Sequence, residues 1–118
     1  MKEGLVLIAH GSRDPEWSRP FERIAASLAR KLPAVSVGLA YLEHGPSLDE
    51  TVTALVAKGV GSIRVVPVFL GQGGHVKEDL PRLVAHSERE GLKLSLDPPI
   101  GEQPQVIEAI AAAISAMR

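Results

Sequence analysis

The sequence predicts an α/β fold in which four βα units form a single four-stranded parallel sheet with helices on both faces. Three observations indicate this fold. Short apolar runs rich in β-branched residues alternate with longer segments of helical period, short connections join them, and turn residues mark the junctions. A chain of 118 residues has the length of one domain, taken here as residues 1–118.

The first half of the chain contains two of these units. Residues 4–9 are continuously apolar, as in a strand buried on both faces, and His10-Gly11-Ser12 is a turn signal. Pro33 closes the helix that follows, and residues 35–42 form the second expected strand. Apolar residues at intervals of four, three and four define one face of that first helix: Trp17, Phe21, Ile24 and Leu28.

The second helix begins at a capping box, in which the Ser47 hydroxyl and the Glu50 carboxylate satisfy each other's backbone N–H groups. Gly59 is its expected left-handed stop. Residues 63–66 form the third strand. Pro67 lies at or beyond the end of that strand because proline cannot donate a hydrogen bond to the ladder.

The last two units are expected after a glycine-rich loop, residues 71–74. The third helix is predicted to begin near Leu80 and Pro81 and to end at Gly91, and residues 92–96 form a short fourth strand. A final helix has Pro104 near its first turn. Its inner face is expected to consist of Val106, Ile107, Ile110, Ile114 and Met117.

Four such units favour the strand order 2-1-3-4, a flavodoxin-like arrangement with right-handed crossovers. Ligands of open parallel sheets bind beyond the carboxyl ends of the strands, where the strand order reverses. In this chain the reversal lies between the first and third strands. The residues expected at that position are His10 and the loop that leads to His75.

Composition excludes several classes of function. Thirteen Lys and Arg against fourteen Asp and Glu give a net charge of −1, which argues against a nucleic-acid partner and a polybasic membrane anchor. There is no cysteine, so disulfides, a thiolate nucleophile and cysteine metal sites are excluded. No run approaches the roughly 20 apolar residues of a membrane span, and residues 5–9 are too short for a signal-peptide core. A cytoplasmic location is therefore expected.

Three of the four histidines are expected at the carboxyl edge of the sheet: His10, His44 and His75. Glu43 lies beside them. Imidazole and carboxylate without thiolate suit divalent cobalt, nickel, iron or zinc, and two histidines with one glutamate leave coordination positions open. The side chain of His44 is expected to point away from that of Glu43. His86, in the middle of a helix, is interpreted as an ordinary surface residue.

Small residues before His75 suggest space for a large flat ligand, and Gly73 and Gly74 leave that histidine free to move. The same loop is a weak match to a phosphate cradle, because no dinucleotide or Walker-type pattern accompanies it. Arg13 and Lys77 lie two or three residues from the two histidines. They are either partners for carboxylates of a ligand or ordinary solvated charges.

Two segments resemble the signature sequences of a known family. Residues 7–13, Leu-Ile-Ala-His-Gly-Ser-Arg, and residues 73–81, Gly-Gly-His-Val-Lys-Glu-Asp-Leu-Pro, are similar to those of the short-form sirohydrochlorin chelatases, the CbiX type of class II chelatase. Residues 42–43 and 46–48 resemble the segment between them. The resemblance extends over essentially the whole chain, up to residues 101–104 before the last helix.

The resemblance implies an ATP-independent lyase that inserts a divalent metal ion into sirohydrochlorin, in the biosynthesis of cobalamin, sirohaem or a nickel tetrapyrrole. Cobalt is the first expectation, with nickel or iron as alternatives. The ion is a substrate, and no tightly bound cofactor is expected. In the family, the histidines that match His10 and His75 bind the metal, Glu43 matches an acidic position of the site, and the short proteins work as homodimers.

Tetrapyrrole contacts are expected from Ser12, Arg13, Gly73, Gly74 and Lys77. Two other functions stay open. A non-catalytic module could hold metal or tetrapyrrole with the same histidines, because a fold and its ligand do not fix an activity. A histidine phosphohydrolase also has a His-Gly pair after its first strand, but Ala9 stands where an arginine would normally contact the phosphate.

Overall fold

The computed structural model describes residues 2–71 and 73–117, and its strands form one parallel sheet in the order β2-β1-β3-β4. This confirms the predicted fold class and strand order. Leu5 pairs with Val37 on one side and with Arg64 on the other, so β1 is a central strand. The strands are β1 (Lys2–Ala9), β2 (Val35–Tyr41), β3 (Val60–Pro67) and β4 (Lys93–Leu96).

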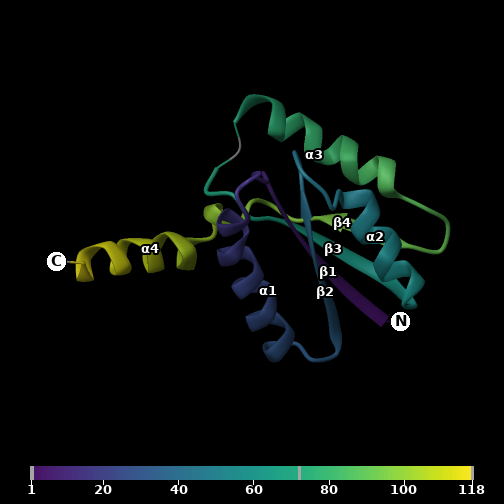
Figure 1. Ribbon diagram of the computed structural model, residues 1–118, viewed down its shortest axis with the longest axis horizontal. Coiled ribbons are helices and arrows are strands. Elements are labelled where there is room, and N and C mark those ends of the chain that lie inside the picture. The colour runs from purple at the N-terminus through teal and green to yellow at the C-terminus, as the bar shows by residue number, and fades with distance from the viewer. Residues whose placement is uncertain (1, 72, 118) are drawn as a thin grey trace.

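Helices lie on both faces of the sheet (Figure 1). Helix α1 (Arg19–Lys31) covers one face, and α2 (Leu48–Ala57) and α3 (Gly74–Ser87) cover the opposite face. Their apolar side chains form two core clusters. The larger cluster packs α2 and α3 against the sheet around Ile8 and Ile63, and the smaller one packs α1 around Leu7.

Two helices begin elsewhere than predicted. Trp17 belongs to a separate 3₁₀ helix, η1 (Pro15–Ser18), whose N-terminus the Asp14 carboxylate caps, and α1 starts after it. Helix α3 begins at Gly74, six residues before the predicted start, and ends at Ser87 instead of Gly91. Pro81 therefore lies inside α3. The prediction was wrong because proline was assigned to the first turn, whereas burial of Leu80 and Val84 holds the helix together across it.

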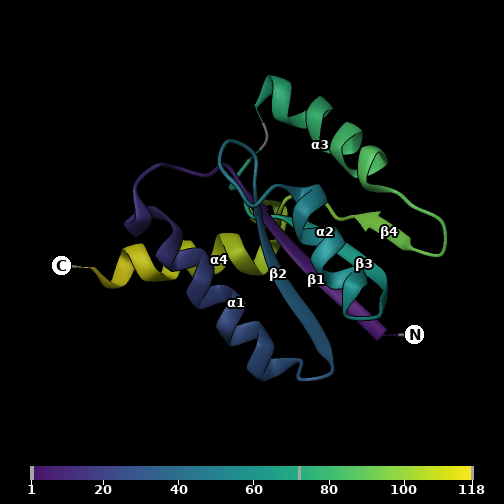
Figure 2. The same ribbon diagram turned by 45° about the vertical axis from the view of Figure 1, so that its right-hand side comes forward.

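The expectation of a packed final helix is also wrong. None of the residues of α4 (Pro104–Ala116) is buried, and its main contacts are with the adjoining 3₁₀ helix η2 (Ile100–Glu102). The helix extends away from the sheet in two views (Figures 1 and 2). Periodicity identifies an apolar stripe, but it does not say which surface covers it.

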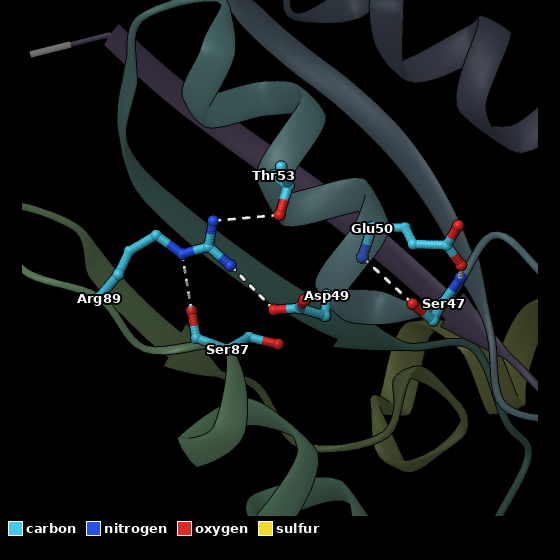
Figure 3. A network of polar contacts seen from close by, with 6 residues as sticks. All are labelled: Ser47, Asp49, Glu50, Thr53, Ser87 and Arg89. Carbon is cyan, nitrogen blue, oxygen red and sulfur yellow. Dashed lines mark hydrogen bonds and ion pairs between the residues drawn. The ribbon is translucent and has the colours of Figure 1, made fainter.

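The predicted capping box at the start of α2 is present, with the Glu50 N–H donating to Ser47 Oγ at 3.1 Å and the Ser47 N–H donating to Glu50 Oε1 at 3.0 Å. Arg89, just after α3, binds the exposed side of α2 (Figure 3). Its guanidinium donates to Asp49 Oδ1 at 2.9 Å and to Thr53 Oγ1 at 3.1 Å. This network fixes the C-terminal end of α3 against α2.

None of the helices within residues 2–71 and 73–117 is long and apolar enough to cross a bilayer.

Candidate active site

An open cleft of about 620 Å³ lies at the carboxyl edge of the sheet, where the sequence places the ligand site. One wall is the end of β1 with the segment that follows β2, and the other wall is α3. Its lining residues are His10, Leu42, Glu43, His75, Val76, Asp79, Arg82, Leu83 and His86. The cleft thus brings together the three predicted catalytic residues, His10, Glu43 and His75, from three separate segments of the chain.

His10 follows β1 directly and is exposed on the cleft side. Its imidazole rests on the buried ring of Phe69, with the ring centroids 4.8 Å apart and the planes tilted by 53°. Gly11 then turns the chain with φ +95°, a conformation that L side chains rarely adopt. A Cβ at Gly11 would also lie 3.0 Å from the Cβ of Tyr41, so glycine is required there for two reasons.

Glu43 is tied to His10 through the backbone. The N–H of Glu43 donates to the carbonyl of His10 at 2.9 Å, and the N–H of Leu42 donates to the carbonyl of Ala9 at 2.9 Å. These bonds continue the β1–β2 pairing past the end of the strands. They therefore hold the backbone of Glu43 next to that of His10, and both residues line the same cleft.

His75 lies in the first turn of α3 and is exposed. The N-cap is Gly73, whose backbone is extended, and no side chain caps this end of the helix. A Cβ at Gly71, Gly73 or Gly74 would meet nothing within 4 Å, so the loop is surrounded by open space on its described residues. His75 is thus held by a helix start with little packing, in contrast to His10, which rests on Phe69.

Helix α3 contributes a row of polar side chains of which the sequence predicted only His75. His75, Asp79, Arg82 and His86 follow one another at intervals of four, three and four and all line the cleft. Asp79 and Arg82 form a loose, exposed ion pair, with 3.9 Å between Oδ1 and Nη1. His86 was interpreted as an ordinary surface residue; it is exposed but faces the cleft. The spacing from His75 was the available signal, and the wrong helix start concealed it.

The remaining predicted residues lie elsewhere. Ser12 and His44 line a separate pocket of about 110 Å³, so His44 points away from Glu43 as expected. Burial raises the pKa of Tyr41 in the same pocket, and the negative charge of Glu22 raises it further. Within the described chain, Arg13, Gly73, Gly74 and Lys77 are exposed and outside the lining of the large cleft.

The cleft does not contain a preassembled metal centre. Among residues 2–71 and 73–117, no three His, Cys, Asp or Glu side chains are grouped as a metal-ion site requires. His10, Glu43 and His75 instead surround an open volume. Such an arrangement suits temporary binding of an ion by few ligands, because a structural site would surround the ion with four.

Fold and cleft together define a class of protein: a doubly wound α/β protein with an open cleft at the topological switch point and imidazole and carboxylate side chains in its lining. The CbiX profile matches residues 4–117, nearly the whole chain. The chain therefore belongs to the CbiX family, as its signature segments suggested.

Relatives agree with this assignment. The chain is 31% identical to the sirohydrochlorin cobaltochelatase of Sulfolobus acidocaldarius over 107 residues, which cover 91% of this chain and 85% of the relative. It is 35% identical to the sirohydrochlorin cobaltochelatase of Methanosarcina barkeri over 97 residues, covering 81% and 75%.

Solved structures share the fold. The cobalamin (vitamin B12) biosynthesis CbiX protein of Marinobacter aquaeolei VT8 superimposes with a TM-score of 0.84 at 34% identity, covering 96% of this chain and 94% of that one. The sirohydrochlorin chelatase SirB of Bacillus subtilis subspecies spizizenii, solved in complex with cobalt, gives a TM-score of 0.83 at 25% identity. This chain is covered to 99% but spans only 51% of SirB, so it corresponds to about half of that protein.

Proposed function

We propose that the protein is a chelatase that inserts a divalent metal ion, with cobalt as the first candidate, into sirohydrochlorin. The observation that carries the proposal is the convergence of His10 and His75 on one open cleft in a chain of the CbiX family. The names of the relatives support the substrate and the metal. The cytoplasmic location expected from the sequence is part of the same proposal.

In this mechanism, neutral imidazoles of His10 and His75 bind the incoming ion and leave positions open for the macrocycle. Pyrrole nitrogens of the macrocycle then replace the imidazoles one after another. Two N–H bonds of the macrocycle break, two metal–nitrogen bonds form in their place, and two protons leave. Glu43 lies on the wall of the cleft beside His10 and is the proposed acceptor of one proton, and a released imidazole accepts the other.

Recognition of sirohydrochlorin requires cations, because its periphery carries carboxylates. Arg82 lines the cleft, and its long ion pair with Asp79 leaves the guanidinium free to reorient. We assign it the direct contact with a carboxylate. Arg13 and Lys77 lie outside the cleft lining and guide the polyanion through longer-range attraction. Gly73 and Gly74 leave open space at the start of α3. Ser12 lines the separate small pocket, so no direct contact is assigned to it.

A second copy of the chain completes the proposed enzyme. The cleft is open, and one sheet edge cannot enclose a flat macrocycle with its side chains. SirB, a sirohydrochlorin chelatase, has about twice the length of this chain. A homodimer would provide the second wall through one self-complementary interface.

The test is spectrophotometric metallation of free sirohydrochlorin with Co²⁺, Ni²⁺ and Fe²⁺ in parallel. Multiple turnovers are expected with the wild-type protein, whereas a carrier would stop at one equivalent. His10→Ala and His75→Ala should each lower kcat/KM by at least about 100-fold, because each removes a direct metal ligand. His44→Ala is the matched control and should keep wild-type kinetics, since His44 lines a different pocket. Wild-type rates in both cleft variants would refute the assignment.

A further inference from the structure

The imidazole of His10 rests on a side chain that does not itself line the cleft. Phe69, two residues after β3, is 7% exposed and belongs to the larger core cluster. The centroids of the two rings lie 4.8 Å apart, and their planes are tilted by 53°. Aromatic rings attract one another at this distance and tilt. The contact therefore joins an exposed candidate metal ligand to the packed core.

This contact differs from the usual support of a metal-binding histidine. A ligating imidazole normally donates its second ring N–H to a carboxylate or carbonyl group, which fixes the direction of the ring. Among residues 2–71 and 73–117, the ring of His10 makes no hydrogen bond of this kind. In this part of the chain, the aromatic contact that restricts rotation of the ring is the one with Phe69.

The segment that carries Phe69 is fixed from two sides. The N–H of Val68 donates to the carbonyl of Ile8 at 2.8 Å, which continues the pairing of β1 with β3 past the end of β3. From the other side, the N–H of Gly101 in η2 donates to the carbonyl of Phe69 at 2.9 Å. The central strand and η2 together hold Phe69 at the carboxyl edge of the sheet.

Gly101 is buried, and it allows η2 to approach this segment closely. A Cβ at residue 101 would overlap the carbonyl oxygen and the Cα of Leu70. Because the obstacle is backbone and not the end of a flexible side chain, a larger residue would force η2 and the Phe69–Leu70 segment apart. The position of Phe69 therefore depends on a glycine 32 positions later in the sequence.

We propose that Phe69 is a positioning residue for His10, and that Gly101 in turn positions Phe69. The aromatic contact limits the orientations of the imidazole before a divalent metal ion arrives, so less freedom is lost when the ion binds. Neither residue contacts the ion or the macrocycle. This inference rests on the proposed function in one respect, the assignment of His10 as a metal ligand.

The first test is the NMR spectrum of the histidine ring protons, recorded on the full chain without metal. The His10 signal is the one missing from the spectrum of His10→Ala. Phe69→Leu and Phe69→Met remove the aromatic ring but keep an apolar side chain. Each should shift the His10 signal more than the signals of the other three histidines, because the ring current of Phe69 is lost.

Gly101→Ala tests the second half of the proposal. This variant keeps both rings, yet it should shift the His10 signal because the added Cβ displaces the Phe69–Leu70 backbone. Gly59→Ala is the matched control. It strains a backbone with φ +90° just after α2, where a Cβ would meet nothing within 4 Å, and should leave the His10 signal in place.

The second test is the dissociation constant of the protein for Co²⁺, followed by the visible absorption of the bound ion. Phe69→Leu should raise this constant about 3- to 10-fold, the range that corresponds to loss of one aromatic pair. Leu55→Ala damages the same core cluster from α2 and should bind Co²⁺ as the wild type does. Circular dichroism melting shows whether the two variants are destabilised alike, which separates positioning of His10 from general loss of packing.

An unshifted His10 signal in Phe69→Leu, or an equal shift in Leu55→Ala, would overturn the proposal. Unchanged Co²⁺ binding by Phe69→Leu, where His10→Ala binds more weakly, would overturn it as well. An unshifted signal in Gly101→Ala would remove Gly101 from it. If His10→Ala binds Co²⁺ as tightly as the wild type, the metal-ligand role of His10 fails, and the NMR shifts still decide whether Phe69 and Gly101 position the ring.

Discussion

At the scale of single residues, the two proposed metal ligands are supported differently. The ring of His10 lies on the buried ring of Phe69, and its carbonyl is fixed by the N–H of Glu43. His75 follows a glycine-rich loop and stands in the uncapped first turn of α3. A fixed ligand paired with an adjustable one suits an ion that must be bound and then released. A site that stores metal would hold every ligand rigidly.

Arg82 is the residue for which structure and sequence point to different roles. The sequence draws attention to Arg13 and Lys77, the cations nearest to the histidines, but of the three only Arg82 lines the cleft. Arg82→Ala should raise the KM for sirohydrochlorin about 10-fold with little change in kcat, as expected for loss of one charge-assisted hydrogen bond. Steady-state metallation kinetics measure this change.

Lys77→Ala is the matched control, since Lys77 also belongs to α3 but lies outside the cleft lining. It should change KM less than about 3-fold, and raised salt should remove its effect because the charge acts at a distance. Equal effects of both substitutions would contradict the contact assigned to Arg82.

The residues found from the sequence are those with a strand-end signal. His10, Glu43 and His75 follow or adjoin the carboxyl ends of parallel strands, so the topology alone brings them to one edge. Asp79, Arg82 and His86 carry no such signal. Their position depends on where α3 begins and on which of its faces lines the cleft. Because Pro81 was taken to mark the start of the helix, neither could be predicted.

At the scale of elements, the sequence predicts a helix start most accurately where a side-chain capping motif defines it. The capping box that starts α2 is present as expected, and the hydrogen bonds from Ser47 lower the pKa of the Glu50 carboxyl, the backbone N–H being the larger cause. Because this pKa is lower in the folded than in the unfolded state, ionised Glu50 stabilises the fold above its unfolded pKa. That contribution is lost as the pH falls through the folded pKa.

Glu50→Gln should therefore be less stable than wild type near neutral pH, and the difference in the free energy of unfolding should shrink as the pH falls. Urea unfolding followed by circular dichroism between about pH 7 and pH 3 measures this difference. Glu88→Gln, at an exposed position after α3, is the control and should follow the wild-type profile. A difference that stays constant over the whole range would show that the charge of Glu50 has no part in the cap.

Positions of whole elements depend on contacts that sequence patterns do not contain. Helix α3 is held against α2 through Arg89, whose partners Asp49 and Thr53 lie far from it in sequence (Figure 3). Helix α4 has the apolar stripe that its period predicts, yet none of its residues is buried against the described chain. Periodicity shows that a stripe exists, but it does not show which surface, if any, covers it.

At the scale of the whole molecule, the strand order and the layers could be predicted because right-handed crossovers leave few alternatives for four βα units. The shape could not, since the chain extends over 51 × 34 × 28 Å with α4 outside the body. In the homodimer that we propose, each cleft keeps both imidazoles from one chain, because His10 and His75 line the same cleft of a single copy. The partner supplies a wall, not a metal ligand.

Because both imidazoles of a cleft come from one chain, two variant chains that each lack one imidazole should not restore activity when they are combined in one dimer. Coexpression of His10→Ala and His75→Ala chains with different affinity tags allows the mixed dimer to be isolated, and its metallation rate should be no higher than that of the better single variant. Each chain of the mixed dimer lacks one imidazole of its own cleft, so neither site is whole. If the metal were instead held between His10 of one copy and His75 of the other, one of the two sites would be intact, and about half of the wild-type rate would return. The mixed dimer of wild-type and His10→Ala chains is the control: it retains one complete cleft and should reach about half of the wild-type rate in either case.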